Sequence, residues 1–270
     1  MDCHPPANPD SEHLMIKHRM LALAAAAAVL PAHALTAGDL AFTSFNADED
    51  GFSLVTFVAL AANTQVYFSD NEWNGSAIGA GGAFNTGESY SRWTSGAAAV
   101  AAGSVIRFSK TDSASLLAAS VGTLARETVS GSANWGLANS AETVYAYQGS
   151  SATAPTGFLA AITNSSFSLA DGTLTGTGLA AGTTALRLRT SGSPDYGVYN
   201  GARSGLASFA AYRPLVANSA NWTVDTTDGN YATTVPNTTA FTLTAVPEPE
   251  RYALMLAGLA GLAFVARRRV

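Results

Sequence analysis

Oxygen-bearing side chains at alternate positions form the first group that could do chemistry. Asn46, Asp48 and Asp50 are spaced by two residues, and Gly51 follows where a tight turn would be needed. Carboxylate and amide oxygens are the ligands that Ca²⁺ prefers, so this spacing is typical of the first half of a calcium loop. The twelfth position is Phe57 rather than the bidentate glutamate of an EF-hand, so that motif is incomplete. A solvated acidic turn between two strands is the alternative, and the sequence favours it.

Two further carboxylates, Asp70 and Glu72, follow a later predicted strand. They would complete a Ca²⁺ site if their loop adjoins residues 46–51. The acidic residues also supply the carboxyl pairs that a glycoside hydrolase needs as acid and as base or nucleophile. The members of this set are Asp48, Asp50, Asp70, Glu72 and Glu88. Because no spacing among them selects a pair, a carboxylate-based hydrolase is the weakest of the function hypotheses.

Aromatic side chains could stack on sugar rings. Trp73 and Trp93 flank the Gly-rich stretch 75–89, which makes them the best candidates for such stacking. The alternative is burial in a core, because large rings remove much apolar area from water. For any single tryptophan the sequence favours burial.

Cysteine and histidine occur only near the N-terminus, as Cys3, His4, His13, His18 and His33. A domain over residues 38–246 therefore excludes a Ser-His-Asp triad, a cysteine nucleophile, a His/Cys zinc site, haem ligation by histidine and disulfides. The same residues carry 14 acidic and 8 basic side chains, a net charge of −6. That balance disfavours a nucleic-acid partner, which would need a basic surface. We expect a non-catalytic domain.

The N-terminal segment has the three parts of a secretory signal. Residues 17–19 (Lys-His-Arg) are a positive n-region, Met20 to Leu30 is an apolar h-region, and Ala32-His33-Ala34 has the small-x-small form of a cleavage site. Cleavage after Ala34 would leave a chain that begins at Leu35. The polar residues 1–14 form a leader, disordered or not translated, if translation starts at Met15. We therefore expect a signal peptide over residues 15–37, with the Sec translocon and signal peptidase as partners.

The C-terminal segment combines a proline motif, an apolar run and a basic cluster. It reads Val246-Pro247-Glu248-Pro249, then an uncharged run over residues 252–266, then Arg267-Arg268-Arg269. The prolines keep the motif extended and accessible to a protease. The apolar run predicts a short transmembrane helix, and the arginines favour the cytoplasmic side, which places the preceding domain outside.

This order of three parts resembles the PEP-CTERM sorting signal of Gram-negative bacteria. The resemblance covers residues 246–270 and implies processing by an exosortase, a membrane protease that removes the signal during export. It also implies an intermediate anchored in the inner membrane, and a final place at the cell surface or in the exopolysaccharide matrix.

The region between the two signals has a β pattern throughout. Alternating apolar and β-branched residues, separated by Gly, Ser, Asn and Asp, predict short strands joined by turns. The predicted strands are 40–45, 52–60, 65–69, 104–109, 142–148, 157–162, 185–190 and 240–244. Only residues 114–119 suggest a turn or two of helix. This pattern predicts an all-β sandwich over residues 38–245, with long Gly- and Ser-rich loops at 75–89 and 164–183.

Residues 38–162 also resemble the lamin-tail type of immunoglobulin-like sandwich. The likeness lies in the order of the turn before Val66 to Asp70, the segment 102–106 and the segment Gly136 to Tyr145. It implies a non-catalytic module of a secreted bacterial protein.

These features together predict an exported, non-catalytic protein with a structural or adhesive role in extracellular polysaccharide. The second hypothesis is a carbohydrate-binding module. Ca²⁺ is the one cofactor that the sequence suggests, through Asn46, Asp48, Asp50, Asp70 and Glu72.

Overall fold

The computed structural model describes residues 1, 34–79, 84–189, 192–225, 229–244, 254–260 and 267. The chain divides into two units, Met1–Pro31 and Ala32–Val270, and the fold below is that of the second. The described residues leave out residues 2–14 of the leader, most of the predicted signal peptide, Ala32, Val246, Pro247, Glu248, Pro249, Arg268 and Arg269. Ala34 and Arg267 are described, and both are exposed.

The first sheet has six strands in the order β12-β11-β1-β2-β5-β6, and every pairing in it is antiparallel. Its strands are β1 (Leu40–Asn46), β2 (Gly51–Thr56), β5 (Val105–Ser109), β6 (Ala118–Ala119), β11 (Tyr196–Tyr199) and β12 (Trp222–Val224).

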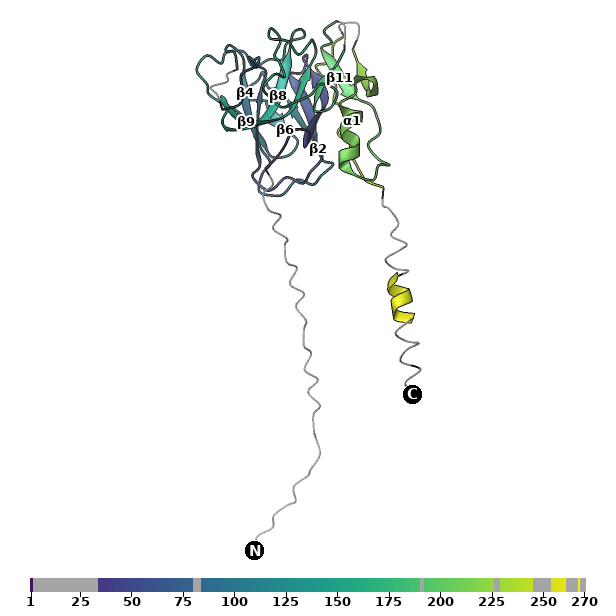
Figure 1. Cartoon of the computed structure of the whole chain (residues 1–270). Coiled ribbons are helices and arrows are strands. Elements are labelled where there is room, and N and C mark those ends of the chain that lie inside the picture. The colour runs from purple at the N-terminus through teal and green to yellow at the C-terminus, as the bar shows by residue number, and fades with distance from the viewer. Residues whose placement is uncertain are drawn as a thin grey trace. The chain divides into compact units, whose positions relative to one another are not determined.

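The second sheet also has six strands, in the order β10-β9-β8-β3-β4-β7. Its strands are β3 (Gln65–Ser69), β4 (Tyr90–Thr94), β7 (Thr123–Arg126), β8 (Thr143–Ser151), β9 (Ala154–Thr163) and β10 (Ala185–Arg187). β9 and β10 pair in parallel, and the other pairings are antiparallel. Figure 1 shows the strands of both sheets in one β-rich body.

A shared apolar core joins the two sheets. Phe68 of the second sheet packs against Phe52 and Phe108 of the first, with ring centroids 5.0 and 4.9 Å apart. Phe68 and Val66 belong to this core, whereas Tyr67 between them belongs to a different cluster. That alternation is expected of a strand whose two faces meet different surroundings. The arrangement is a β-sandwich.

The other face of the second sheet is also covered. Tyr67, Tyr145 and Tyr147 project from β3 and β8 into a second apolar cluster with Trp73 and Phe84. Trp73 and Phe84 come from the loop between β3 and β4, where they form an isolated bridge and their ring centroids lie 5.2 Å apart. The long loops therefore act as an outer layer, and burying aromatic rings against the sheet holds them in place.

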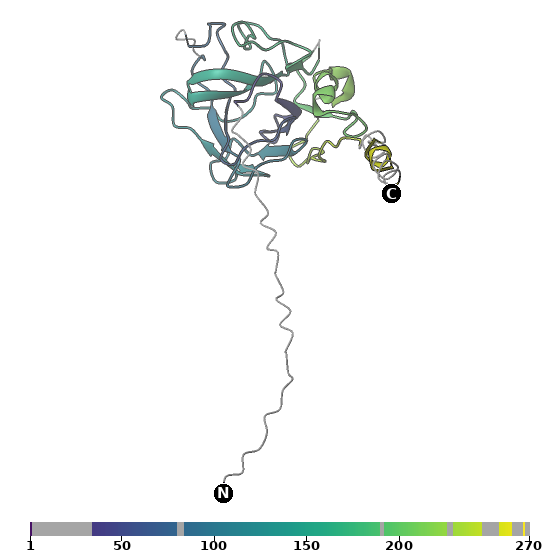
Figure 2. The ribbon, with the colours of Figure 1, turned by 60° about the horizontal axis from the view of Figure 1, so that its bottom comes forward.

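Short helical turns pack beside the first sheet. They are η1 (Phe209–Tyr212), α1 (Arg213–Val216) and η2 (Ser219–Asn221), and Figures 1 and 2 both show this green segment at one side of the strands. Arg213 forms a 2.8 Å ion pair with Asp39, which precedes β1. Phe241 packs against Tyr212, with ring centroids 5.1 Å apart, and so ties the segment 229–244 to the same side.

Residues 254–260 are helical, with exposed side chains that include Leu254 and Leu256. Within the described part of the chain, no helix has the length and apolar character needed to cross a membrane. The predicted transmembrane segment 252–266 lies largely among residues that the structure does not describe.

The all-β prediction is confirmed, and four local predictions are wrong. The predicted strand 185–190 ends at Arg187, the last residue of β10. Strand β2 ends at Thr56 instead of residue 60, because the Thr56 hydroxyl donates to the Val58 carbonyl and the chain bends there. Residues 240–244 form no strand, since their amides bond to loop carbonyls of Gly103, Arg203 and Leu206. Residues 114–119 form turns that lead into β6 rather than a helix.

Candidate metal centre

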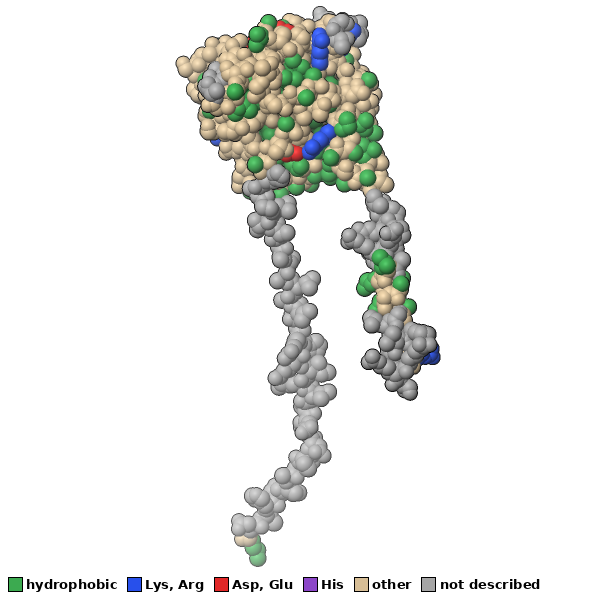
Figure 3. Space-filling view, in the orientation of Figure 1, with side chains coloured by type: hydrophobic (Ala, Val, Ile, Leu, Met, Phe, Trp, Pro, Cys, Tyr) green, Lys and Arg blue, Asp and Glu red, His purple; other side chains and the backbone are tan. Residues whose placement is uncertain are grey.

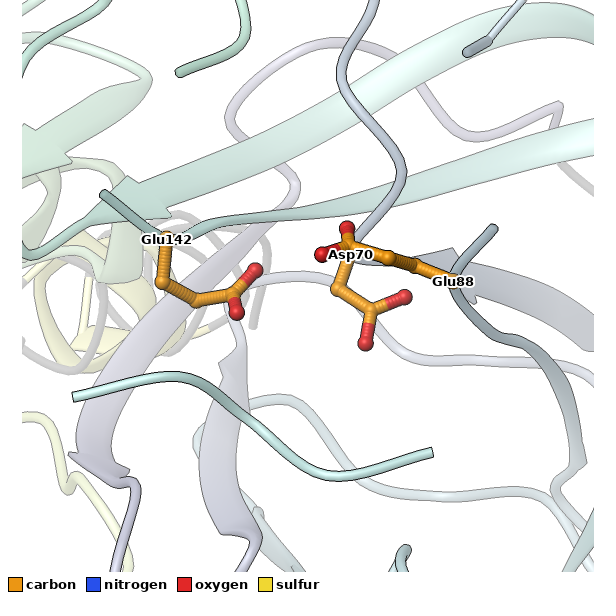
Figure 4. A group of neighbouring side chains, drawn as sticks. All are labelled: Asp70, Glu88 and Glu142. Carbon is orange, nitrogen blue, oxygen red and sulfur yellow. The ribbon is translucent and has the colours of Figure 1, made fainter. Parts of the chain in front are cut away.

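Three carboxylates lie where neighbouring strands of the second sheet meet. Asp70 directly follows β3, Glu88 lies just before β4 and Glu142 just before β8. Because β3 pairs antiparallel with both β4 and β8, its end lies beside the starts of the other two. One oxygen of each carboxylate lies within 4.8 Å of the others. Figure 4 shows Glu142 and Glu88 reaching in from opposite sides, with Asp70 between them.

Asp70 is fixed by one of its oxygens only. Its Oδ1 accepts hydrogen bonds from the Ser89 amide and the Ser89 hydroxyl, both at 2.8 Å. Its Oδ2 is buried and has no hydrogen-bond partner, and the residue as a whole is 3% exposed. A buried carboxylate oxygen without a donor is costly, so this atom needs an explanation.

The two glutamates are held by their backbones and by one side-chain oxygen. Glu142 Oε2 accepts from the Ala138 amide at 2.8 Å, and the Glu142 amide donates to Asn164 Oδ1 at 2.8 Å. The Glu88 amide donates to Asn71 Oδ1 at 3.1 Å. Asn71 and Asn164, both buried, therefore fix the backbone at Glu88 and Glu142, so the fold itself positions these two carboxylates.

The electrostatic environment disfavours three ionised carboxylates. Burial raises the pKa of Asp70 to about 7 and the pKa of Glu88 to about 7, and it raises the pKa of Glu142 well above the ordinary value. Repulsion from Glu72 raises all three pKa values further, and the charge of Asp70 also raises those of Glu88 and Glu142.

Among the described residues, no arginine forms a salt bridge with these three carboxylates. The described salt bridges pair Arg92 with Glu127, Arg107 with Glu49, and Arg213 with Asp39. The cluster therefore places three acidic side chains in a largely buried site without a basic side chain, among those described, to pair with them.

The space beside Asp70 is small. A cavity of about 10 Å³ borders its carboxylate and is otherwise lined mainly by apolar side chains such as Phe52, Phe68 and Leu137. That volume suits one water molecule or one ion. It has no room for a sugar ring beside Asp70.

The loop 46–51 uses its oxygens differently from the calcium-loop prediction. Asp48 Oδ2 accepts from the Tyr231 amide at 2.6 Å, and the Asn46 side-chain amide donates to the Tyr231 carbonyl at 3.0 Å. Asp50 Oδ1 accepts from the Leu137 amide at 2.7 Å, and burial raises the pKa of Asp50 to about 6. These side chains hold distant segments of backbone against the loop.

The structure brings only one of the five predicted Ca²⁺ ligands into the carboxylate cluster. Asp70 lies there with Glu88 and Glu142, whereas Asn46, Asp48, Asp50 and Glu72 are not members. Glu72 acts on the cluster through its charge alone. Glu142 was not among the predicted site residues: its place at the start of the predicted strand 142–148 was visible in the sequence, but the pairing of that strand with β3 was not.

The two tryptophans proposed for glycan stacking are buried. Trp73 is 0% exposed and Trp93 is 1% exposed. Their ring nitrogens donate to the carbonyls of Thr175 at 3.0 Å and Val121 at 2.7 Å. With the ring faces in the core and the N–H groups satisfied, neither ring offers a surface to a sugar, which is the burial alternative that the sequence favoured.

A larger cavity, of about 220 Å³, lies on the outer layer of the second sheet. Phe84 and Tyr90 line it together with the loop segments 86–87 and 129–132 and with Thr153. Its polar groups come mainly from threonine and serine side chains.

Comparison with protein-family models, with curated proteins and with solved structures gives no match. The function must therefore be argued from this chain's own residues.

Proposed function

We propose that this is an exported, non-catalytic β-sandwich protein with a structural or adhesive role at the cell surface or in the exopolysaccharide matrix of a Gram-negative bacterium. The observation that carries the proposal is the order of parts after the sandwich: Pro247-Glu248-Pro249, an apolar run, then three arginines. The N-terminal n-region, h-region and Ala32-His33-Ala34 supply the matching export signal. Its partners are then the Sec translocon, signal peptidase, an exosortase, the inner membrane before processing, and extracellular polysaccharide.

The chemistry of the domain supports a non-catalytic role. Residues 38–246 contain no histidine or cysteine. The cavity beside Asp70, of about 10 Å³, is too small for an organic substrate. The face shown in Figure 3 is mostly uncharged, with few acidic or basic side chains, as a protein that contacts neutral polymer chains through many small polar groups would have.

Cell fractionation tests this proposal. In cells with the exosortase the protein is expected in the matrix fraction, and in cells without it the protein should stay in the inner membrane. A double variant, Pro247→Ala with Pro249→Ala, is expected to stay in the membrane in both strains. The matched control, Thr238→Ala with Thr239→Ala, changes two exposed residues outside the motif and should behave as wild type. A cytosolic wild-type protein in both strains would refute the proposal.

The second candidate is a carbohydrate-binding module, and the cavity beside Phe84 and Tyr90 is the observation that favours it. Aromatic rings with polar loop groups around them are common in sugar sites. Binding on a glycan array, lost in a Tyr90→Ala variant that remains folded, would support this function over a purely structural one. Turnover of exopolysaccharide by the purified protein would instead support the third hypothesis, a carboxylate-based hydrolase.

A further inference from the structure

We propose that the carboxylates of Asp70, Glu88 and Glu142 bind one Ca²⁺ ion, which ties the β3–β4 loop and the segment before β8 to the end of the second sheet. This inference goes beyond the function proposed above and does not depend on export.

The geometry already resembles an assembled oxygen site. The three carboxylates come from segments far apart in the chain, yet one oxygen of each lies within 4.8 Å of the others. Oxygens that coordinate one Ca²⁺ ion at 2.3–2.6 Å are separated by distances of this order. Small movements of three side chains would therefore suffice, without a change in the strands that carry them.

The unpartnered oxygen of Asp70 is the independent sign of a ligand. Ser89 donates two hydrogen bonds to Oδ1, so Oδ2 is the oxygen of Asp70 that remains available to coordinate a ligand. It is buried, and the residue is 3% exposed, so bulk water does not serve it. Figure 4 shows this carboxylate in one group with those of Glu88 and Glu142. A cation at this place would satisfy Oδ2 and offset the mutual repulsion of the cluster.

The donor set selects the kind of cation. Three carboxylates with no nitrogen or sulfur ligand suit a hard ion, which favours Ca²⁺ or Mg²⁺ over zinc or copper. Mg²⁺ demands a regular octahedron and keeps several of its own waters. Ca²⁺ tolerates irregular, largely protein-derived coordination, so it suits three carboxylates fixed by the fold better.

Binding would stabilise the outer layer of the sandwich. Asp70 and Glu88 begin and end the loop that carries Trp73 and Phe84, and these two rings cover the outer face of the second sheet. Glu142 directly precedes β8, the strand that supplies Tyr145 and Tyr147 to the same cluster. An ion held by all three acidic residues would fasten both ends of the loop to the neighbouring strand.

Thermal unfolding of the full chain in detergent, with a chelator or with CaCl₂, tests the proposal. For a site with Kd of order 0.1 mM, about 10 mM Ca²⁺ should raise Tm by roughly 5–10 °C, and Mg²⁺ at equal concentration by much less. Asp70→Asn should abolish the shift. Asp50→Asn is the matched control, since it alters a half-buried carboxylate whose Oδ1 accepts a backbone hydrogen bond outside the cluster, and it should keep the shift.

Tb³⁺ luminescence gives a second readout if Asp70→Asn does not fold. Tyr90 pairs in register with Ser69, the residue before Asp70, so excitation of tyrosine should sensitise Tb³⁺ bound in the cluster. Ca²⁺ should displace this emission in the wild type, and Glu88→Gln should weaken it at least tenfold. The proposal is overturned if wild type shows neither a Tm shift nor displaceable emission, or if Asp50→Asn loses both while the cluster variants keep them.

Discussion

Replacing Asp70 with asparagine should change how stability depends on pH. In the absence of divalent cations, burial raises the pKa of Asp70 from 3.8 to about 7 in the folded protein. The native state then holds a proton that the unfolded chain has released between about pH 4 and pH 7. The free energy of unfolding therefore falls as pH rises through this window, and the loss is complete above pH 7.

The size of the effect follows from that pKa difference. Each pKa unit corresponds to about 1.4 kcal/mol, so Asp70 alone accounts for an order-of-magnitude loss of about 4 kcal/mol between pH 4 and pH 8. Glu88 and Glu142 act in the same direction, but the three repel one another, so their effects are shared rather than summed. The pKa of Asp50 is raised to about 6 by burial, which leaves a smaller slope in the variant.

Asp70→Asn keeps an oxygen that can accept from Ser89 and removes the charge. With chelator present, we expect the variant to be more stable than wild type at pH 8 by a few kcal/mol, by less than half of that difference at pH 5, and close to it at pH 4. Urea unfolding followed by tryptophan fluorescence at several pH values measures the free energy of unfolding of the wild type and of the variant.

Asp171→Asn is the control, because its side chain accepts from Ser165 and Ser166 outside the cluster, and it should leave the slope unchanged. A wild-type stability that is flat or rises from pH 5 to pH 8 in chelator, with the same profile in Asp70→Asn, would refute this account of the cluster.

Two further predictions concern the packing. In urea unfolding, Phe84→Ala should lower the free energy of unfolding by about 3–5 kcal/mol, because the Phe84 ring packs in the outer aromatic cluster. Leu169→Ala, at an exposed position, should lower it by less than about 0.5 kcal/mol in the same assay. Gly103→Ala should lower the free energy of unfolding far more than Gly79→Ala in the same assay. Both glycines have φ near +80°, so the backbone strain is similar. A Cβ at Gly103 would lie 2.2 Å from the Phe241 carbonyl oxygen, whereas a Cβ at Gly79 would have no neighbour within 4 Å. Equal losses at the two glycines would show that the close approach at Gly103 has no energetic weight.

The sequence predicted the strands whose alternation is undisturbed. The predicted strand 65–69 coincides with β3, and the predicted start of the strand 185–190 is the first residue of β10. Five strands were not predicted, namely β4, β6, β7, β11 and β12. They are short and follow loops, and they owe their pairing to neighbours distant in the sequence, which local pattern cannot show.

The candidate site shows the same limit. Acidic residues after Asn46 read locally as a calcium loop, yet the fold uses Asp48 and Asp50 to hold backbone amides of Tyr231 and Leu137. The carboxylates that do converge come from three separate segments, and only the antiparallel pairing of β3 with β4 and β8 brings them together. Spacing along the chain carries no signal for such a group.

The intact mass of the protein recovered from the extracellular matrix tests the central claim of export most directly. We predict a single chain that begins at Leu35 and lacks the terminal Arg267-Arg268-Arg269 segment. A mass that retains both the N-terminal segment and the three arginines, in protein recovered from the cytosol, would contradict it.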